Sequence, residues 1–147
     1  MEITISRMSL EDLNSISDIL IKEFDDFWNY SVFKDELSNS NSTYFVAKDA
    51  SQEIVGFAGV WFGYEEAHIT NIVTKKNKRH LGIATNLLQT LVDYCKRRPS
   101  IFSLTLEVKE SNISAIGLYK KFNFEKVGIR KNYYNGLENA IIMTKKL

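Results

Sequence analysis

A short glycine-containing turn between a strand-like segment and a helical segment constrains the fold of this chain most strongly. The turn, Arg79–Ala84, reads RHLGIA and follows a largely apolar run at Ala67–Val73. After it, apolar residues recur at steps of three and four, the spacing of one helix face: Ala84, Leu87, Leu88, Leu91, Val92 and Cys95. Pro99, the single proline of the chain, ends the predicted helix. The middle of the chain is therefore predicted to be a strand, a tight turn and an amphipathic helix.

This turn is a candidate phosphate-binding site. The first N–H groups of a helix lack partners within the helix and lie at its positive end, where phosphate groups bind. Positive charge precedes the turn, at Lys75, Lys76, Lys78 and Arg79. The dinucleotide pattern of three spaced glycines and the Gly-Lys-Ser/Thr pattern of nucleoside-triphosphate loops are both absent. The turn alone leaves two interpretations open: a phosphate site, or an ordinary strand-to-helix connection beside a solvated basic loop.

Length and composition predict one soluble, globular domain over residues 1–147. Of the 147 residues 44% are hydrophobic, without a long uninterrupted apolar run, and no segment typical of an export signal begins the sequence, so we expect a cytoplasmic protein. One cysteine excludes an internal disulfide, and with two histidines it disfavours a zinc site, so we expect no metal. Cys95 lies on the apolar helix face and is expected to be buried. A formal net charge of +1 argues against a dedicated nucleic-acid binder.

The rest of the chain predicts alternating strands and helices without repeats. A capping-box pattern at Ser9 and Asp12 predicts the start of a helix whose apolar face continues from Leu10 to Phe24. The other predicted elements are a strand at Ile3–Arg7, a short helix at about Val32–Ser38, strands near Tyr44–Lys48 and Ile54–Phe62, a strand at Phe102–Val108, a helix at Asn112–Phe122 and two final strands.

The turn and several later segments share the pattern of one family. The turn fits Arg/Gln-x-x-Gly-x-Gly/Ala, and the later segments are Leu106–Val108, Ser111–Tyr119, Phe122–Phe124, Arg130–Tyr134 and Ala140–Met143. With them the chain resembles the GNAT superfamily of N-acetyltransferases, and within it the RimI group of N-terminal alanine acetyltransferases. The resemblance covers residues 53 to 147, and the first fifty residues match loosely. It implies an α/β fold: a mixed, mostly antiparallel sheet of about seven strands with helices on both faces.

The resemblance also implies acetyl-CoA as the co-substrate and a set of residues that bind it. Backbone groups of a strand end and of the turn, with one asparagine, would make the contacts: Ile72, Val73, Thr74, Arg79, His80, Leu81, Gly82, Ile83, Ala84, Thr85 and Asn112. Asn112 stands at a predicted helix start and is independently expected to cap that helix.

Two residues are candidates for proton transfer. Acyl transfer to an amine requires that a proton leaves the amine and that the departing thiolate gains one. Glu107 alternates with buried-type residues on a predicted strand and so lies on the other face. The resemblance implies that Glu107 is the general base and Tyr119 the general acid. The alternatives are a salt-bridged or solvated carboxylate and a tyrosine that only packs.

Aromatic residues are expected to bind the acceptor, a protein N-terminus or peptide: Trp28, Tyr30, Tyr133 and Tyr134. Trp28 could equally cover the core. Because far more α-amines than lysines are uncharged at neutral pH, an α-amine is favoured. The resemblance implies the N-terminal alanine of a small-subunit ribosomal protein. Lys76 and Asn139 depart from the group's usual proline and acidic residue.

Three alternatives remain open at this point. The same fold could acetylate a lysine, a polyamine or an amino-sugar antibiotic. It could also bind acyl-CoA without turnover, although the presence of both Glu107 and Tyr119 disfavours this. The basic segments Lys75–Arg79 and Lys96–Arg98 could bind nucleic acid, a partner that the leading interpretation excludes together with a membrane. The sequence does not specify an oligomeric state.

Overall fold

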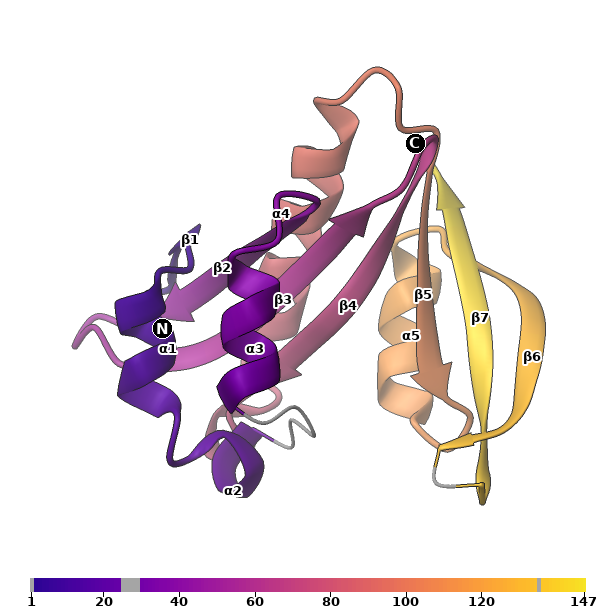
Figure 1. Cartoon of the computed structure of the whole chain (residues 1–147). Coiled ribbons are helices and arrows are strands. Elements are labelled where there is room, and N and C mark those ends of the chain that lie inside the picture. Colours follow the sequence, from indigo (N-terminus) through magenta and orange to yellow (C-terminus); the bar gives the residue numbers. More distant parts are fainter. Residues whose placement is uncertain (1, 25–29, 135) are drawn as a thin grey trace. The chain divides into compact units, whose positions relative to one another are not determined.

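A mixed sheet organises the chain (Figure 1). The computed structural model describes residues 2–24, 30–134 and 136–147. In this part of the chain seven strands hydrogen-bond in the order β1-β2-β3-β4-β5-β7-β6. The strands are β1 Thr4–Arg7, β2 Ser42–Lys48, β3 Ile54–Phe62, β4 Glu66–Thr74, β5 Ser103–Lys109, β6 Glu125–Tyr134 and β7 Glu138–Lys146. The helices are α1 Leu10–Ile16, α2 Leu20–Phe24, α3 Tyr30–Leu37, the 3-10 helix η1 Lys76–Lys78, α4 Ile83–Lys96 and α5 Ile113–Lys121.

The strand pairing confirms the predicted mixed, mostly antiparallel sheet. The pairs β1–β2, β2–β3, β5–β7 and β6–β7 are antiparallel, whereas β4 and β5 are parallel. The chain divides into two compact units, the first made of Met1–Trp61 and Thr70–Tyr94 and the second of Phe62–Ile69 and Cys95–Leu147. Strand β4 therefore contributes its beginning to the second unit and its end to the first.

Helices cover both faces of the strands in the first unit (Figure 1). On one face α1, α2 and α3 form a core with β2 and β3, and its buried residues are Leu13, Ile16, Leu20, Phe24, Phe33, Tyr44, Val46, Ile54 and Phe57. The opposite face carries α4. There Gly56 of β3 has no side chain, and a Cβ in its place would lie 3.0 Å from Ile83 and 3.1 Å from Leu87. Gly56 thus allows the first turn of α4 to pack closely on β3.

Helix α4 has the amphipathic pattern that the sequence predicts. Leu87, Leu88 and Leu91 are fully buried, and so is Cys95, as expected. Burial raises the pKa of the Cys95 thiol to about 11, so the thiol stays protonated at neutral pH and serves as a packing group. None of the helices in the described residues, α4 included, is long and apolar enough to cross a membrane.

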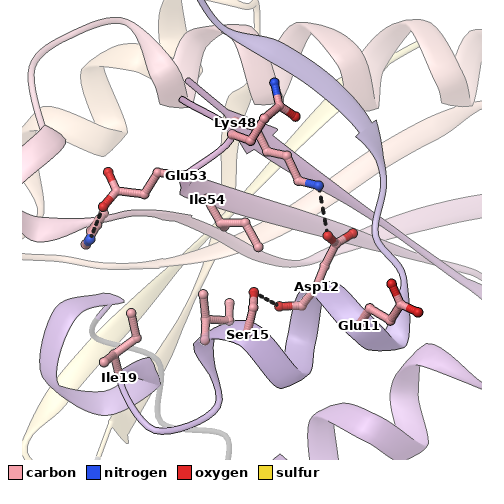
Figure 2. Close-up of a pocket in the computed structure, with 10 residues that line it drawn as sticks. Glu11, Asp12, Ser15, Ile19, Lys48, Glu53 and Ile54 are labelled. Atoms are coloured by element: carbon pink, nitrogen blue, oxygen red, sulfur yellow. Dashed lines mark hydrogen bonds and ion pairs between the residues drawn. The ribbon is translucent and has the colours of Figure 1, made fainter. Parts of the chain in front are cut away.

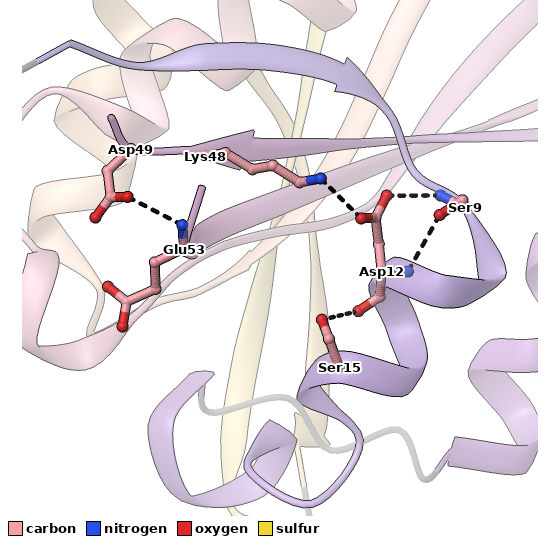
Figure 3. Close-up of polar contacts among 6 residues, drawn as sticks. All are labelled: Ser9, Asp12, Ser15, Lys48, Asp49 and Glu53. Carbon is pink, nitrogen blue, oxygen red and sulfur yellow. Dashed lines mark hydrogen bonds and ion pairs between the residues drawn. The ribbon is translucent and has the colours of Figure 1, made fainter. Parts of the chain in front are cut away.

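Helix α1 begins with the predicted capping box (Figure 3). The Ser9 N–H donates to Asp12 Oδ2 at 2.9 Å, and the Asp12 N–H donates to Ser9 Oγ at 3.1 Å. Lys48 of β2 pairs with the same carboxylate, at 3.0 Å from Oδ1. Burial alone would raise the pKa of Asp12, but the hydrogen bonds from Ser9 and Lys48 together lower it below its usual value. The ionised carboxylate therefore fastens the start of α1 to β2.

The prediction of one continuous helix from Leu10 to Phe24 was wrong, because the chain turns between α1 and α2. The Ser17 hydroxyl donates to the Asn14 carbonyl at 3.1 Å, and the Ile19 N–H donates to the Ile16 carbonyl at 3.0 Å. Serine side chains that bond to nearby backbone groups compete with helical hydrogen bonds. Leu10, expected on the buried face, is 45% exposed.

In the second unit, strand β5 shows the predicted alternation. Leu104, Leu106 and Val108 are buried, whereas Thr105 and Glu107 lie on the other face and are half-buried. Strand β7 pairs with β5 along its length and with β6 on its other side. The alternation therefore directs Glu107 away from the buried face, as the sequence predicts.

Candidate active site

The glycine turn joins η1 to α4 and has an unusual backbone. His80 and Gly82 adopt left-handed conformations, with φ of 66° and 81°. The Gly82 carbonyl accepts a hydrogen bond from the Asn86 N–H at 3.1 Å, so the N–H groups of Ile83–Thr85 lie in the first helical turn, where no helical carbonyl precedes them. A Cβ built on Gly82 would meet no heavy atom within 4 Å. The turn thus presents N–H groups and a positive helix end beside open space, which suits a phosphate group.

The end of β4 leads directly into this turn. The parallel ladder with β5 runs from Glu66–Ser103 to His68–Thr105, and β4 continues past it to Thr74. Ile72, Val73 and Thr74, expected to bind the cofactor through their backbones, are half-buried there. The first unit therefore contains both backbone segments of the expected cofactor site.

Lys75 does not supply free positive charge to the turn, contrary to the expectation from the sequence. Its side chain is 9% exposed, and its Nζ lies 3.0 Å from Glu53 Oε1 and 3.3 Å from Glu23 Oε1. The hydrogen bond to Glu53 is the main cause that raises the pKa of Lys75, although burial opposes it. Lys75 therefore links the end of β4 to α2 and β3 as a neutralised, structural cation.

Replacing Lys75 by methionine should lower the free energy of unfolding by about 1–2 kcal/mol at pH 7, because two carboxylates lose their cation. The loss stays below that of a fully buried pair because the Glu23 and Glu53 side chains are 39% and 46% exposed and can be hydrated. Since its pKa is raised, Lys75 contributes fully below about pH 10 and loses this contribution as pH rises through that pKa. Urea unfolding of both proteins across this range measures the difference, and a constant difference up to the highest pH would contradict the ion pair.

The first unit also has a hollow of about 500 Å³, which is lined by residues other than those expected to bind the cofactor. Side chains of α1, the β2–β3 turn and the end of β4 line it (Figure 2). Its two lysines are both neutralised, Lys48 by Asp12 and Lys75 by Glu53. None of the residues expected to bind acetyl-CoA or an acceptor lines this hollow. Within residues 2–24, 30–134 and 136–147, no group of three His, Cys, Asp or Glu side chains could hold a metal ion.

Glu107 makes a specific ion pair in the second unit. Its Oε1 lies 3.0 Å from a guanidinium nitrogen of Arg130 on β6. Its other oxygen, Oε2, is buried and has no hydrogen-bond partner among the described residues. The side chain as a whole is 26% exposed. One oxygen of this carboxylate is thus held, and the other can accept a proton or a hydrogen bond.

Tyr119 belongs to α5, which follows β5, and Asn112 is the N-cap of this helix. Tyr119 is 5% exposed, and its ring packs against Phe124 with centroids 5.8 Å apart. Asn112 caps the helix as expected, because its Oδ1 accepts a hydrogen bond from the Ala115 N–H at 3.1 Å. The second unit thus holds Glu107, Asn112 and Tyr119 on one strand and the helix that follows it.

The structure describes the side chains of two of the four residues expected to bind the acceptor, Tyr30 and Tyr133. Tyr30 begins α3, and its hydroxyl donates to Asn14 Oδ1 at 2.6 Å, so it also ties α3 to α1. Tyr133 of β6 is 48% exposed. Trp28 and the side chain of Tyr134 lie outside the described residues.

Sequence reasoning missed the role of Arg130, which it placed only within a family-like segment. The pair joins β5 to β6 across β7, and such a contact depends on the register of two strand pairs. The sequence shows only that Arg130 is a positively charged residue late in the chain, and several other lysines and arginines share this property. The sequence therefore does not single out Arg130.

Comparison with known proteins gives consistent results over most of the chain. A model of the Acetyltransferase (GNAT) family matches residues 12–124. A Bacillus subtilis protein provisionally assigned as a ribosomal protein bS18-alanine N-acetyltransferase is 36% identical over 141 residues, which cover 95% of this chain and 92% of that protein. An N-alpha-acetyltransferase of Sulfolobus acidocaldarius is 30% identical and covers 95% of this chain and 89% of its own length.

A solved structure shows the same fold. The crystal structure of the ribosomal-protein-S18-alanine N-acetyltransferase from Escherichia coli superposes with a TM-score of 0.87 at 30% sequence identity. The match covers 99% of this chain and 94% of that one. Sequence and structure therefore agree over nearly the full length of both proteins.

Proposed function

The chain belongs to the acetyltransferase (GNAT) family, and from this premise we propose that it transfers the acetyl group of acetyl-CoA to the N-terminal α-amine of a protein. The acceptor that we propose is the N-terminal alanine of a small-subunit ribosomal protein. The observation that carries this choice is the similarity, over 95% of the chain, to the Bacillus subtilis protein provisionally assigned as a ribosomal protein bS18-alanine N-acetyltransferase. We further propose that residues 1–147 act as one cytoplasmic N-acetyltransferase domain, since the family match includes parts of both units.

The first unit carries the groups that suit the diphosphate of acetyl-CoA. The residues that would hold it are the turn from Arg79 to Thr85, which includes His80, Leu81, Ile83 and Ala84, together with the backbone of Ile72–Thr74. Gly82 supports this role, because its φ of 81° and the open space at its Cβ position leave the backbone accessible. Asn112, besides capping α5, would contact the cofactor. When bound, acetyl-CoA supplies an activated thioester carbonyl.

The second unit carries the groups that suit proton transfer. Glu107 removes a proton from the attacking amine, directly or through a water molecule, with its partner-free Oε2 as the acceptor atom. As the nitrogen–carbon bond forms and the carbon–sulfur bond breaks, the Tyr119 hydroxyl returns a proton to the departing sulfur. Backbone N–H groups of Ile72–Thr74 stabilise the negative charge on the carbonyl oxygen. The reaction needs no covalent enzyme intermediate and no metal.

An α-amine suits a single carboxylate base better than a lysine does. At pH 7 roughly a tenth of α-amino groups are uncharged, against about one lysine in a few thousand. A carboxylate base assisted only by water can therefore use the uncharged α-amines that are already present, whereas very few lysine side chains are uncharged. Tyr30, Tyr133, Tyr134 and Trp28 are the residues that we propose to bind the peptide that follows the α-amine.

Binding of nucleic acid through the basic segments is less favoured. Lys75 is neutralised by two glutamates, and the guanidinium group of Arg98 lies over the Phe62 ring, 3.9 Å from its centroid. Both residues thus serve contacts within the protein. Acetylation of a lysine, polyamine or amino sugar is the remaining alternative. The peptide experiment described next distinguishes acetylation of an α-amine from acetylation of a side-chain amine.

Incubation with acetyl-CoA and a panel of short peptides that differ in the first residue tests the proposed acceptor. The side-chain amines of one set are blocked and the α-amines of the matched set are blocked instead. Fragmentation mass spectrometry should locate the acetyl group on the α-amine, with the highest rate for peptides that begin with alanine. Acetylation restricted to peptides with free lysines would refute the α-amine assignment.

A further inference from the structure

We propose that Arg130 is a positioning residue that holds one oxygen of Glu107 and leaves the other as the proton acceptor. This inference rests on the proposed function, because it assigns a partner to the proposed base. It involves only residues of the second unit. The structure places the guanidinium nitrogen 3.0 Å from Glu107 Oε1, whereas Oε2 is buried without a partner among the described residues.

The strand register explains how two residues on separate strands meet. Glu107 lies opposite Ile142 of β7, and Gly128 of β6 lies opposite the same Ile142 from the other side, so all three share one face. Arg130 follows Gly128 by two residues and lies on that face too. About 10 Å separates β5 from β6 across β7. Ala140, the direct partner of Arg130, has only a methyl group, which lets the long arginine side chain cross β7 to Glu107.

Arg130 also contacts the aromatic ring of Tyr133. Its guanidinium carbon lies 4.7 Å from the centroid of the Tyr133 ring, a cation–π contact that orients the planar group. Arginine suits this role because its planar fork can donate to a carboxylate while its flat face stacks on an aromatic ring. Tyr133, guanidinium and carboxylate thus form a series of contacts that fixes the rotation of the Glu107 side chain.

The two oxygens of Glu107 then have different tasks. Oε1 already pairs with the guanidinium group of Arg130, so it is a poor acceptor for the proton of the amine. Oε2 is shielded from solvent and lacks a donor, which is unfavourable for an ionised carboxylate until a donor arrives. The amine of the acceptor, or a water molecule that it contacts, is a donor of the required kind. The geometry thus assigns Oε2 to the acceptor and Oε1 to Arg130.

The test compares Arg130→Gln and Arg130→Lys with the unchanged protein. Arg130→Gln should lower kcat/KM for the acceptor peptide about ten- to a hundredfold, because the carboxylate is no longer oriented. Its KM for acetyl-CoA should stay the same. Arg130→Lys keeps the charge but lacks the planar fork, so it should recover only part of the rate.

Lys126→Gln is the matched control, since it removes one exposed positive charge from the same strand without contact to Glu107 in the described structure. It should leave the rate unchanged. Crystal structures of the unchanged protein and of Arg130→Gln give a readout that does not depend on catalysis. The Glu107 side chain should adopt one conformation in the unchanged protein and more than one in Arg130→Gln.

The outcomes separate this inference from the proposed function. If Arg130→Gln shows an unchanged rate and an unchanged Glu107 conformation while Glu107→Gln is inactive, the role of Arg130 is refuted and the proposed function stands. If the unchanged protein does not acetylate any α-amine, the proposed function fails, and the conformation of Glu107 in Arg130→Gln alone decides whether Arg130 orients Glu107.

Discussion

Glu107→Gln is expected to lower kcat for acetylation of an alanine peptide about 10²–10³-fold, because the amide cannot accept the proton of the attacking amine. Glutamine has nearly the same shape, and its carbonyl can still accept a hydrogen bond from Arg130, so the fold and the placement of this side chain should change little. Acetyl-CoA affinity should remain the same, because the expected diphosphate contacts lie in the turn around Gly82.

Steady-state kinetics with saturating acetyl-CoA measures this effect. Glu110→Gln is a suitable control because it removes an exposed carboxylate only three residues away. Its rate should match that of the unchanged protein. A Glu107→Gln variant that retains full turnover would remove Glu107 from the mechanism.

Gly82→Asp should weaken acetyl-CoA binding about 30-fold relative to Gly82→Asn. The aspartate would place a negative charge next to the proposed diphosphate site, where repulsion at an effective dielectric constant near 20 amounts to about 2 kcal/mol. Asparagine and aspartate are the residues other than glycine that best tolerate a left-handed backbone, such as the φ of 81° at Gly82. The open space at its Cβ position accommodates either side chain. The pair therefore differs mainly in charge.

Equilibrium dialysis of both variants with labelled acetyl-CoA gives the two dissociation constants. The difference should shrink as salt increases, because screening weakens repulsion at an exposed turn. Both variants should lose a similar, small amount of stability relative to glycine. Equal affinities of the aspartate and asparagine variants at low salt would show that the diphosphate binds elsewhere.

Much of the fold follows from periodicity within single segments. The alternation in β5 predicts that Leu104, Leu106 and Val108 are buried and that Glu107 faces the other way, because neighbouring strand residues point to opposite faces. The spacing in α4 likewise predicts the buried Cys95. These patterns need no knowledge of distant residues. Where the break between α1 and α2 occurs depends instead on local competition at Ser17, which the apolar pattern does not show.

Contacts between distant segments could not be predicted in this way. The sequence suggests that Lys75 serves the phosphate turn, but its carboxylate partners, Glu23 and Glu53, come from α2 and from the turn before β3. The pair of Glu107 and Arg130 requires the register of β7 with both of its neighbours. Charge pairs of this kind depend on tertiary structure, and many alternative pairings are compatible with the sequence.

Titration calorimetry of the whole chain with acetyl-CoA tests the central claim most directly. The account predicts one binding site per chain, saturable at micromolar to millimolar concentration and blocked by prior addition of CoA. A titration of the folded protein that shows no binding of acetyl-CoA or CoA in this range would contradict the account.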